Sequence, residues 1–504
     1  MKSSKSSKLI TDTNILLLLG LALFLIHMFT NHQYGFHQDE MVVVDNAYNL
    51  DWGYVEYPPI TPFLTRISLD IFGLSLVSAR MFAALAQSII MVLAGLMARE
   101  LGGKRATQIL AAIATAIAPI ALVEGATVMY MTFDFLWSVL IAYFAIRMLK
   151  SEDPRWWLGI GAAIGLGMMT KFTMAFFAAG IVGGVLLTDV RRYLKSPWLW
   201  GGVVLSLLVF LPNMLWQIQH NFISLDFLQG IHARDVEIGR ADDYLIEQFV
   251  FCANTVVIPL WVAGLYYYFF RQDGKRFRMM GWMFVITFMI YFLAQGRSYY
   301  EAPAYPMLIA AGAVVWQEWI DKLSMQKARV ALGTTWSILV VGAVFAGTLA
   351  LPIPPINSPL FNAVSEVHDL FTEQIGWQDM VKTIGDIYAG LPAEEKARSG
   401  ILTQENDEAA ALNLYGGEYG LPKAISGSDT FWLRGYGNPP PETLIIVGIE
   451  HPYIDLFFEQ CTMAGTVTNS YGIKNDLTNP SGIYVCRKAR LLWPEIWKRI
   501  KHYS

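Results

Sequence analysis

The sequence predicts a multi-pass α-helical membrane protein that ends in a small α/β domain outside the membrane. Of its 504 residues, 54% are hydrophobic and only 15% are charged, whereas soluble domains carry about 25% charged residues. Apolar stretches long enough to cross a bilayer recur up to residue 350, and the composition changes after that point.

The same figures exclude several classes of protein. A net charge of −4 with 13% aromatic residues is typical neither of a disordered chain nor of a nucleic-acid-binding protein. Three cysteines are too few for a disulfide scaffold or a Cys-rich metal site.

Eleven apolar stretches approach the roughly 20 residues that cross a hydrocarbon core of about 30 Å. They cover residues 14–30, 74–98, 107–123, 132–149, 156–170, 172–188, 198–216, 245–270, 279–294, 302–317 and 330–350. The fifth and sixth meet at Thr170 and Lys171, so they are either two short spans or one broken span. The first follows a basic start and lacks a small-residue cleavage site, which predicts an uncleaved anchor.

Basic residues set the orientation, because Lys and Arg stay on the cytoplasmic side. With the N-terminus and its Lys2, Lys5 and Lys8 inside, 19 of the 25 Lys and Arg residues before residue 351 are cytoplasmic. We therefore expect a protein of the cell membrane whose C-terminal domain is extracytoplasmic. The exceptions are Arg66, Arg80, Lys171, Arg234, Arg240 and Arg297.

Residues 351–504 form the predicted extracytoplasmic domain, which follows the transmembrane domain of residues 1–350. Pro and Gly cluster at its start, and its charged fraction is higher. It mixes three predicted strands with two predicted helices, as a small α/β unit does. The strands are 400–404, 443–448 and 482–486, and the helices 377–389 and 407–415. Cys461 and Cys486 share this oxidising compartment and could pair, whereas Cys252 lies in a span and packs there.

The segment after the first span, residues 31–57, is rich in acids and is called the acidic segment below. It contains five carboxylates and no Lys or Arg: Asp39, Glu40, Asp45, Asp51 and Glu56. Unpaired acids must be solvated, paired or bound to a cation. Simple solvation is a sufficient account of Asp45 and Asp51. Asp39 and Glu40 lie just beyond a span, where a carboxylate meets both lipid headgroups and a water-side substrate.

A helix in the membrane interface is predicted directly after Glu56-Tyr-Pro-Pro59. Apolar residues recur there at helical spacing, with polar residues on the opposite face. The apolar face comprises Ile60, Phe63, Leu64, Ile67 and Ile71, and the polar face Thr61, Thr65, Arg66, Ser68 and Asp70. Such a helix would hold the acidic segment flat against the bilayer.

Five motifs in this order resemble the GT-C glycosyltransferases of family 39, which include dolichyl-phosphate-mannose protein mannosyltransferases and the lipid A aminoarabinose transferase. They are Asp39-Glu40, Gly53–Pro59, Met131–Asp134, Thr170-Lys171 and Tyr299–Pro306. The resemblance extends over nearly the whole chain, including the C-terminal domain. It implies a GT-C fold and transfer of a sugar from a polyprenyl phosphate to an acceptor hydroxyl at the outer face, usually with inversion.

One-step inversion needs a base for the acceptor proton and stabilisation of the leaving phosphate. The resemblance assigns Asp39 as that base or as an acceptor-orienting or metal-binding carboxylate, with Glu40 beside it and Asp134 as a second carboxylate. It also suggests a divalent metal held by Glu56 and His232, a pair that suits zinc but does not define a site. Tyr57 stands where the lipid A transferase has a lysine, which puts aminoarabinose transfer in doubt.

Basic residues on the outer side would have a role in such an enzyme, because they can bind the donor phosphate. This group comprises Lys171, Arg234, Arg240 and Arg297, with Tyr299 and Tyr300 beside the last. Snorkelling to the interface is the alternative for Lys171 and Arg297, and it is the preferred interpretation of Arg66 and Arg80.

Two other functions fit a polytopic protein with polar groups at membrane depth. A transporter or flippase of a lipid-linked sugar usually has paired halves, and neither the Asp-Glu pair nor Glu-Tyr-Pro-Pro recurs. An inactive sugar-lipid binding protein would not need Asp39 and Glu40. The sequence leaves the acceptor open among lipid, polysaccharide and protein.

Overall fold

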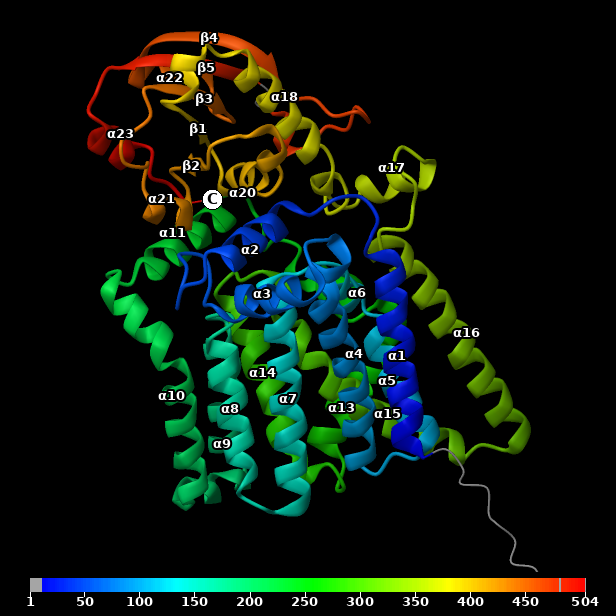
Figure 1. The fold of residues 1–504 in the computed structure, drawn as a ribbon. Coiled ribbons are helices and arrows are strands. Elements are labelled where there is room, and N and C mark those ends of the chain that lie inside the picture. Colours follow the sequence, from blue (N-terminus) through cyan, green and yellow to red (C-terminus); the bar gives the residue numbers. More distant parts are fainter. Residues whose placement is uncertain (1–10, 480–481, 504) are drawn as a thin grey trace, which may run out of the picture.

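The computed structural model describes residues 11–479 and 482–503, so Lys2, Lys5 and Lys8 lie outside the described residues. The chain forms a bundle of long helices, and a domain with a β-sheet stands at one end of it (Figure 1). The last long helix ends at Ala350, and the sheet-containing part follows it.

A helix occupies each of the eleven predicted apolar stretches. The helices are α1 (Asp12–Thr30), α4 (Leu76–Glu100), α5 (Arg105–Ala116) with α6 (Pro119–Ala126), α7 (Tyr130–Ser151), α8 (Trp156–Met168), α9 (Met174–Leu186) with η1 (Asp189–Lys195), α10 (Pro197–Gln219), α13 (Ile258–Phe270), α14 (Arg278–Leu293), α15 (Tyr305–Asp321) and α16 (Met325–Ala350). Among the described residues, six helices are long and apolar enough to cross a membrane, or nine if each of three bent pairs is one span. Eleven crossings therefore stay a prediction.

Two of the bent pairs lie inside stretches predicted to be continuous. Between α5 and α6 the chain turns by 67°, because Ala118 precedes Pro119 and is held in the extended region. The stretch 245–270 bends by 86° between α12 (Tyr244–Glu247) with η2 (Gln248–Cys252) and η3 (Thr255–Val257) with α13. There Asn254 adopts a left-handed φ of 65°. Its side-chain amide donates a hydrogen bond to the carbonyl of Ile117 at 2.7 Å.

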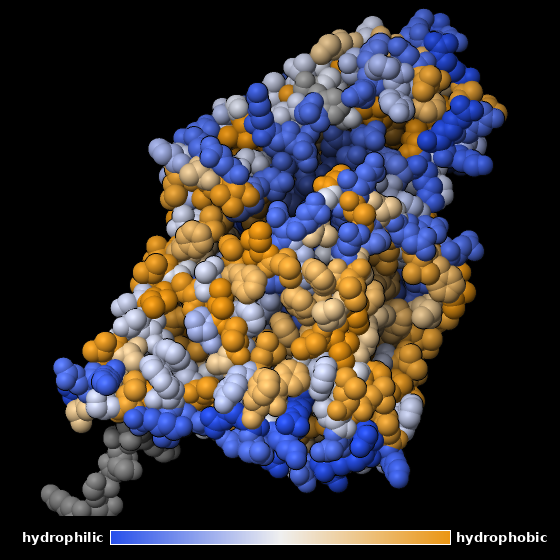
Figure 2. Space-filling model, turned by 180° about the vertical axis from the view of Figure 1, so that it is seen from behind, coloured by the Kyte–Doolittle hydropathy of each residue, from blue (hydrophilic) through white to orange (hydrophobic). Residues whose placement is uncertain are grey.

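A band of hydrophobic side chains covers the bundle on the face shown in Figure 2, with hydrophilic residues at its far end and around the C-terminal domain. Exposed Leu, Val, Ile and Phe side chains on α1, α10 and α16 contribute to the apolar surface of the bundle. Exposed apolar surface of this extent is typical of helices that face lipid.

Two shorter helices, α2 (Gln38–Tyr48) and α3 (Ile60–Phe72), lie between the bundle and the C-terminal domain (Figure 1). The polar face of α3 packs inward, where Thr61, Thr65 and Ser68 are buried. Its apolar residues Phe63 and Ile71 are exposed. A helix that turns its apolar face away from the protein fits the predicted position in the membrane interface.

The C-terminal domain is built on a five-stranded sheet of order β2-β1-β3-β5-β4. Its elements are α17 (Pro359–Ser365), α18 (Trp377–Gly390), α19 (Ala393–Lys396), β1 (Ser399–Thr403), α20 (Asn406–Tyr415), β2 (Ala424–Ser426), α21 (Asp429–Arg434), β3 (Thr443–Val447), α22 (His451–Phe457), β4 (Phe458–Thr466), β5 (Gly482–Ala489) and α23 (Trp493–Arg499). Strands β2, β1 and β3 are parallel, and β5 and β4 are antiparallel to their neighbours.

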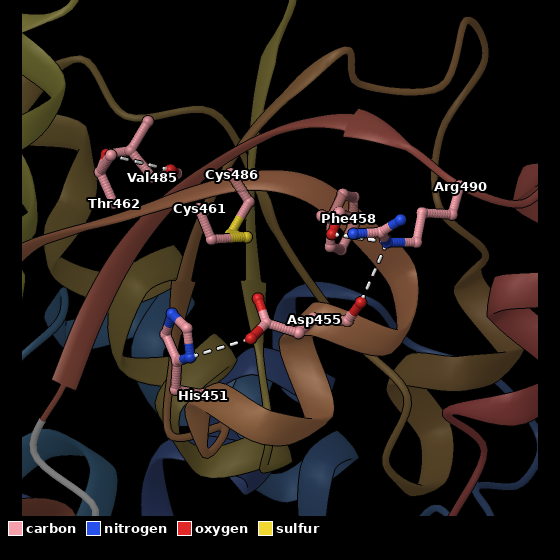
Figure 3. Close-up of a disulfide and its surroundings, with 8 residues drawn as sticks. All are labelled: His451, Asp455, Phe458, Cys461, Thr462, Val485, Cys486 and Arg490. Carbon is pink, nitrogen blue, oxygen red and sulfur yellow. Dashed lines mark hydrogen bonds and ion pairs between the residues drawn. A yellow bond between two sulfur atoms is a disulfide. The ribbon is translucent and has the colours of Figure 1, made fainter.

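Cys461 and Cys486 form a disulfide between directly paired residues of β4 and β5 (Figure 3). On the same side of the sheet, Arg490 donates to the carbonyls of Asp455 and Phe458 and ties α22 to the end of β5. Cys252 is buried within the bundle and free, in agreement with a packing role.

Candidate functional site

Glu40 is part of a fully buried ion pair in the structure. The guanidinium of Arg80 donates to both of its carboxylate oxygens, at 2.8 and 2.6 Å, and both side chains are 0% exposed. The backbone amides of His37 and Val128 complete its hydrogen bonds. Arg80 therefore does not snorkel to the interface. Both oxygens of Glu40 are occupied by protein groups, so this residue anchors the acidic segment to α4.

Asp39 points the other way from the same turn of α2. Its side chain is 52% exposed, and its backbone amide donates to the ring of His37, which caps the helix. Within residues 11–479 and 482–503, no hydrogen bond to its carboxylate is found, and the His37 ring nitrogen lies 4.0 Å from one of its oxygens.

The other three acids of the acidic segment are bound by protein groups. Asp45 is buried, contrary to the interpretation as a solvated acid, and is held by Arg434 and by Asn413 at 3.0 Å. Asp51 accepts a hydrogen bond from the indole of Trp216 at 2.9 Å. Glu56 is bound by the C-terminal domain, as described below. Asp51 is nevertheless exposed, as Asp39 is, and Asp39 is the one acid of this segment whose carboxylate accepts no hydrogen bond among the described residues.

Lys171 lies in a cage of tyrosine rings between α8 and α9. Its ammonium is 4.4 Å from the ring centre of Tyr130, 4.2 Å from that of Tyr300 and 5.4 Å from that of Tyr299. Only 9% of the residue is exposed. In the described part of the chain, no carboxylate oxygen lies within 4.0 Å of the ammonium. The faces of aromatic rings attract an ammonium group electrostatically.

Asp134 is buried on α7 near this cage, not in an exposed loop. One of its oxygens is 3.4 Å from the hydroxyl of Thr173, and the other is buried with no hydrogen bond among the described residues. Asp134 and Asp39 both lie within electrostatic reach of Lys171. The structure therefore brings together three predicted site residues from three separate motifs.

Asp235 on α11 (Ile223–Glu237) gathers the predicted arginines. Arg297 donates to its two oxygens at 2.6 and 3.2 Å, and Arg234 and Arg240 lie 3.6 and 3.9 Å from it. Arg297 also donates to the hydroxyl of Tyr299 at 3.1 Å, which links the cluster to the tyrosine cage. The sequence analysis missed Asp235, although its position beside Arg234 was a signal.

The predicted metal pair does not come together in a form that suits a metal. Both carboxylate oxygens of Glu56 accept hydrogen bonds from Thr430, one from its backbone amide and the other from its hydroxyl. The oxygen bound to the backbone amide also accepts a hydrogen bond from the side-chain amide of Asn406 at 3.2 Å. His232 is exposed. On the same helix, Ser224 donates a hydrogen bond to the carbonyl of Tyr54 in the acidic segment. His232 lies eight residues, or about 12 Å, further along α11 from this contact. No group of three or more His, Cys, Asp or Glu suited to a metal ion occurs in the described residues.

A row of acids at the start of α20 faces the acidic segment. Burial raises the pKa of Asp407 well above its usual range, and the nearby charges of Glu408, Glu405 and Asp39 raise it further. Burial likewise raises the pKa of Glu408 to about 7, although its carboxylate accepts the backbone amide of Glu405 at 3.1 Å. Asp407 and Glu408 were not singled out from the sequence as site residues. Packing between α2 and α20 brings Asp407 within electrostatic reach of Asp39.

The raised pKa of Glu408 predicts a pH-dependent stability. The folded state keeps the proton that the unfolded state releases, so the free energy of unfolding should fall as pH rises from about 4.5 to about 7, by up to about 1.4 kcal/mol per pH unit. Glu408→Gln should flatten this slope. Thermal unfolding of both proteins across this range, followed by intrinsic fluorescence, tests it. An unchanged slope in the variant would contradict the assignment.

Comparisons with known proteins agree with this arrangement. Residues 56–216 match a family model described as dolichyl-phosphate-mannose-protein mannosyltransferase. The lipid A galacturonosyltransferase RgtD of Rhizobium johnstonii is 22% identical over 447 residues, which cover 84% of this chain and 91% of the relative.

Solved structures share the fold at low identity. ArnT from Cupriavidus metallidurans in the apo state superposes with a TM-score of 0.59 at 15% identity, covering 94% of this chain and 97% of that one. The same protein bound to undecaprenyl phosphate gives a TM-score of 0.58. The apo oligosaccharyltransferase of Archaeoglobus fulgidus gives 0.50 at 12% identity, covering 82% of this chain and 64% of that one. The predicted GT-C fold is thereby confirmed, whereas the count of eleven spans stays a prediction.

Proposed function

We propose, from the family match over residues 56–216 and the shared fold, that the chain is a GT-C glycosyltransferase that moves a sugar from a polyprenyl-phosphate donor to an acceptor hydroxyl at the extracytoplasmic membrane surface. One observation carries the proposal. Asp39, the acid of the acidic segment that protein groups leave free, lies within electrostatic reach of Lys171, a caged cation without a carboxylate within 4.0 Å among the described residues.

The two groups suit the two needs of an inverting transfer. Asp39 takes the proton of the acceptor hydroxyl, whose oxygen attacks the anomeric carbon. The bond from that carbon to the phosphate oxygen breaks on the opposite side, and the lipid phosphate leaves as an anion. Lys171 binds this anion, and its charge is worth most in a site shielded from water.

The groups around Lys171 have positioning roles. Burial lowers the pKa of Lys171, and Asp134, within electrostatic reach, opposes this shift and favours the charged form of the lysine. Tyr130, Tyr299 and Tyr300 fix the ammonium, and Arg297, held by Asp235, braces Tyr299. Arg234 lies at the rim of the same cluster and adds a second cation for the phosphate. Glu40, paired with Arg80, holds α2 so that Asp39 faces the site.

Removing the Lys171 charge tests the donor half of the proposal. Lys171→Met should weaken binding of undecaprenyl phosphate about 10- to 100-fold, since a hydrogen bond to a charged group is worth about 1.5–3 kcal/mol. Lys171→Arg should retain part of the affinity. Titration calorimetry of the purified protein in detergent measures the effect.

The matched control is Lys104→Met, which removes an exposed lysine whose partner, Asp321, is also exposed. Unchanged affinity in Lys171→Met, or an equal loss in Lys104→Met, would remove Lys171 from the phosphate site.

A further inference from the structure

A cavity of about 770 Å³ lies at the seam between the acidic segment and the C-terminal domain. We call it the seam cavity, and the residues that matter here are Asn49, Arg398, Lys423, Arg434, Tyr436 and Glu442. Its volume is within the range of about 300–1,000 Å³ found for small-molecule sites. Neither Asp39 nor Lys171 lines it, so it is separate from the site described above.

The charges of the seam cavity favour an anion. It is lined by three cations and one acid. Arg398 pairs with Glu442 at 3.2 Å, but both are largely exposed, and such pairs are weak and readily exchanged. Lys423 is exposed and has no ion pair among the described residues. Arg434 is held by Asp45 and lies 4.3 Å above the ring of Phe431, which fixes its position.

The shape of the wall favours a saccharide. Tyr436 lines the cavity while its ring stacks on Trp493 at 5.1 Å, which presents a rigid aromatic surface. Gly435 and Gly437 flank Tyr436 and have left-handed φ values of 78° and 88°. At these two positions the backbone lines the seam cavity without a side chain. A flat aromatic surface with nearby polar and charged groups is a typical arrangement for a ligand pocket.

The position relates the seam cavity to the reaction. Asn49 ends α2 and Asp39 lies in its first turn, so the two are ten residues or about 15 Å apart. A saccharide seated in the cavity is therefore a few sugar rings from the base. Binding energy from a remote part of a substrate can hold its reacting hydroxyl in place.

We propose that the seam cavity binds an anionic saccharide portion of the acceptor, two to three sugar units from the hydroxyl that receives the new sugar. This inference rests on the proposed function, because it identifies the ligand as acceptor. The anionic saccharide can be the headgroup of a membrane glycolipid or part of a soluble glycan. Exposed Tyr48 and Leu50 beside Asn49 offer an apolar surface to a lipid chain.

Trigalacturonate and maltotriose are the probes, because they are trisaccharides that differ in charge. We expect the full-length protein in detergent to bind trigalacturonate, and Lys423→Glu to weaken this binding at least about tenfold. Maltotriose should bind more weakly and be unaffected by the substitution. The matched control is Lys382→Glu, an exposed lysine of α18 outside the cavity.

Three outcomes would overturn the proposal: equal loss in Lys382→Glu, maltotriose binding as tightly as trigalacturonate, or no binding of either at about 10 mM. To identify the source, octyl glucuronide is compared with glucuronate. Tighter binding of the octyl form, lost in Leu50→Ser, assigns a glycolipid, and equal binding assigns a soluble glycan. Both results uphold the anion site.

Asp39→Asn separates this inference from the proposed function. It should abolish sugar transfer and leave trigalacturonate binding unchanged, because Asp39 does not line the seam cavity. Loss of binding with Lys423→Glu in a protein that shows no sugar transfer would leave the anion site standing and refute only its link to the acceptor.

Discussion

Asp39→Asn should abolish sugar transfer, with kcat reduced about 10³-fold or more, because asparagine cannot accept the acceptor proton. The protein should still fold and bind undecaprenyl phosphate. The side chain is half exposed, and only its backbone amide takes part in capping α2. Transfer from a radiolabelled polyprenyl-phosphate sugar to membrane acceptors, together with thermal unfolding, gives the two readouts.

Asp51→Asn is the matched control for that variant. Asp51 belongs to the same acidic segment and is bound to Trp216 instead of facing the site. Its substitution should leave kcat within about twofold of the unsubstituted protein. Full activity in Asp39→Asn would refute the assignment of the base.

Glu40→Gln should destabilise the protein by about 3–5 kcal/mol, because it leaves the guanidinium of Arg80 buried without a counter-charge. Arg80 has no exposure to water, and its other contacts are neutral groups such as the carbonyls of Asn31 and Gly35. Thermal unfolding in detergent, followed by tryptophan fluorescence, should show a clearly lower midpoint.

A double variant separates the ion pair from catalysis. Glu40→Met with Arg80→Met replaces both charges by apolar side chains and should recover much of the lost stability. If Glu40→Gln unfolds normally but fails to transfer sugar, Glu40 acts in the reaction, as the sequence analysis expected, and not as an anchor.

The contrast between Asp39 and Glu40 shows what the sequence could not decide. Adjacent residues of a helix point about 100° apart, so an Asp-Glu pair cannot be a single functional unit on one face. Which of the two faces the site depends on Arg80, which lies 40 residues away in the chain. The sequence predicted catalytic roles for both acids, and the structure buries Glu40 in an ion pair while it leaves Asp39 exposed.

The helices were largely predictable, because the bilayer requires long apolar stretches. The positions at which the helices break were less predictable. Pro119 marks one bend, but the bend at Asn254 depends on hydrogen bonds to two distant carbonyls. In the C-terminal domain, β1, β3 and β5 lie on the predicted strands. By contrast, β2 has only three residues, and β4 lacks an alternating burial pattern, so neither had a signal.

Contacts between distant parts of the chain fixed the rest of the site. Asp235 and the tyrosine cage bring together α11, α7 and the segment before α15. No local sequence pattern predicts that these three segments are in contact. Lys171 was predicted as a site residue because a lone lysine between apolar stretches is rare, and its role stays a prediction.

The seam between the two parts of the chain has a consequence for exchanging them between relatives. Asp45 and Glu56 of the acidic segment are bound by Arg434, Asn413 and Thr430 of the C-terminal domain. A chimera that takes its membrane half from one enzyme and its C-terminal half from another would lose these matched partners. Its α2 would be released together with Asp39, so the two halves act as one functional unit.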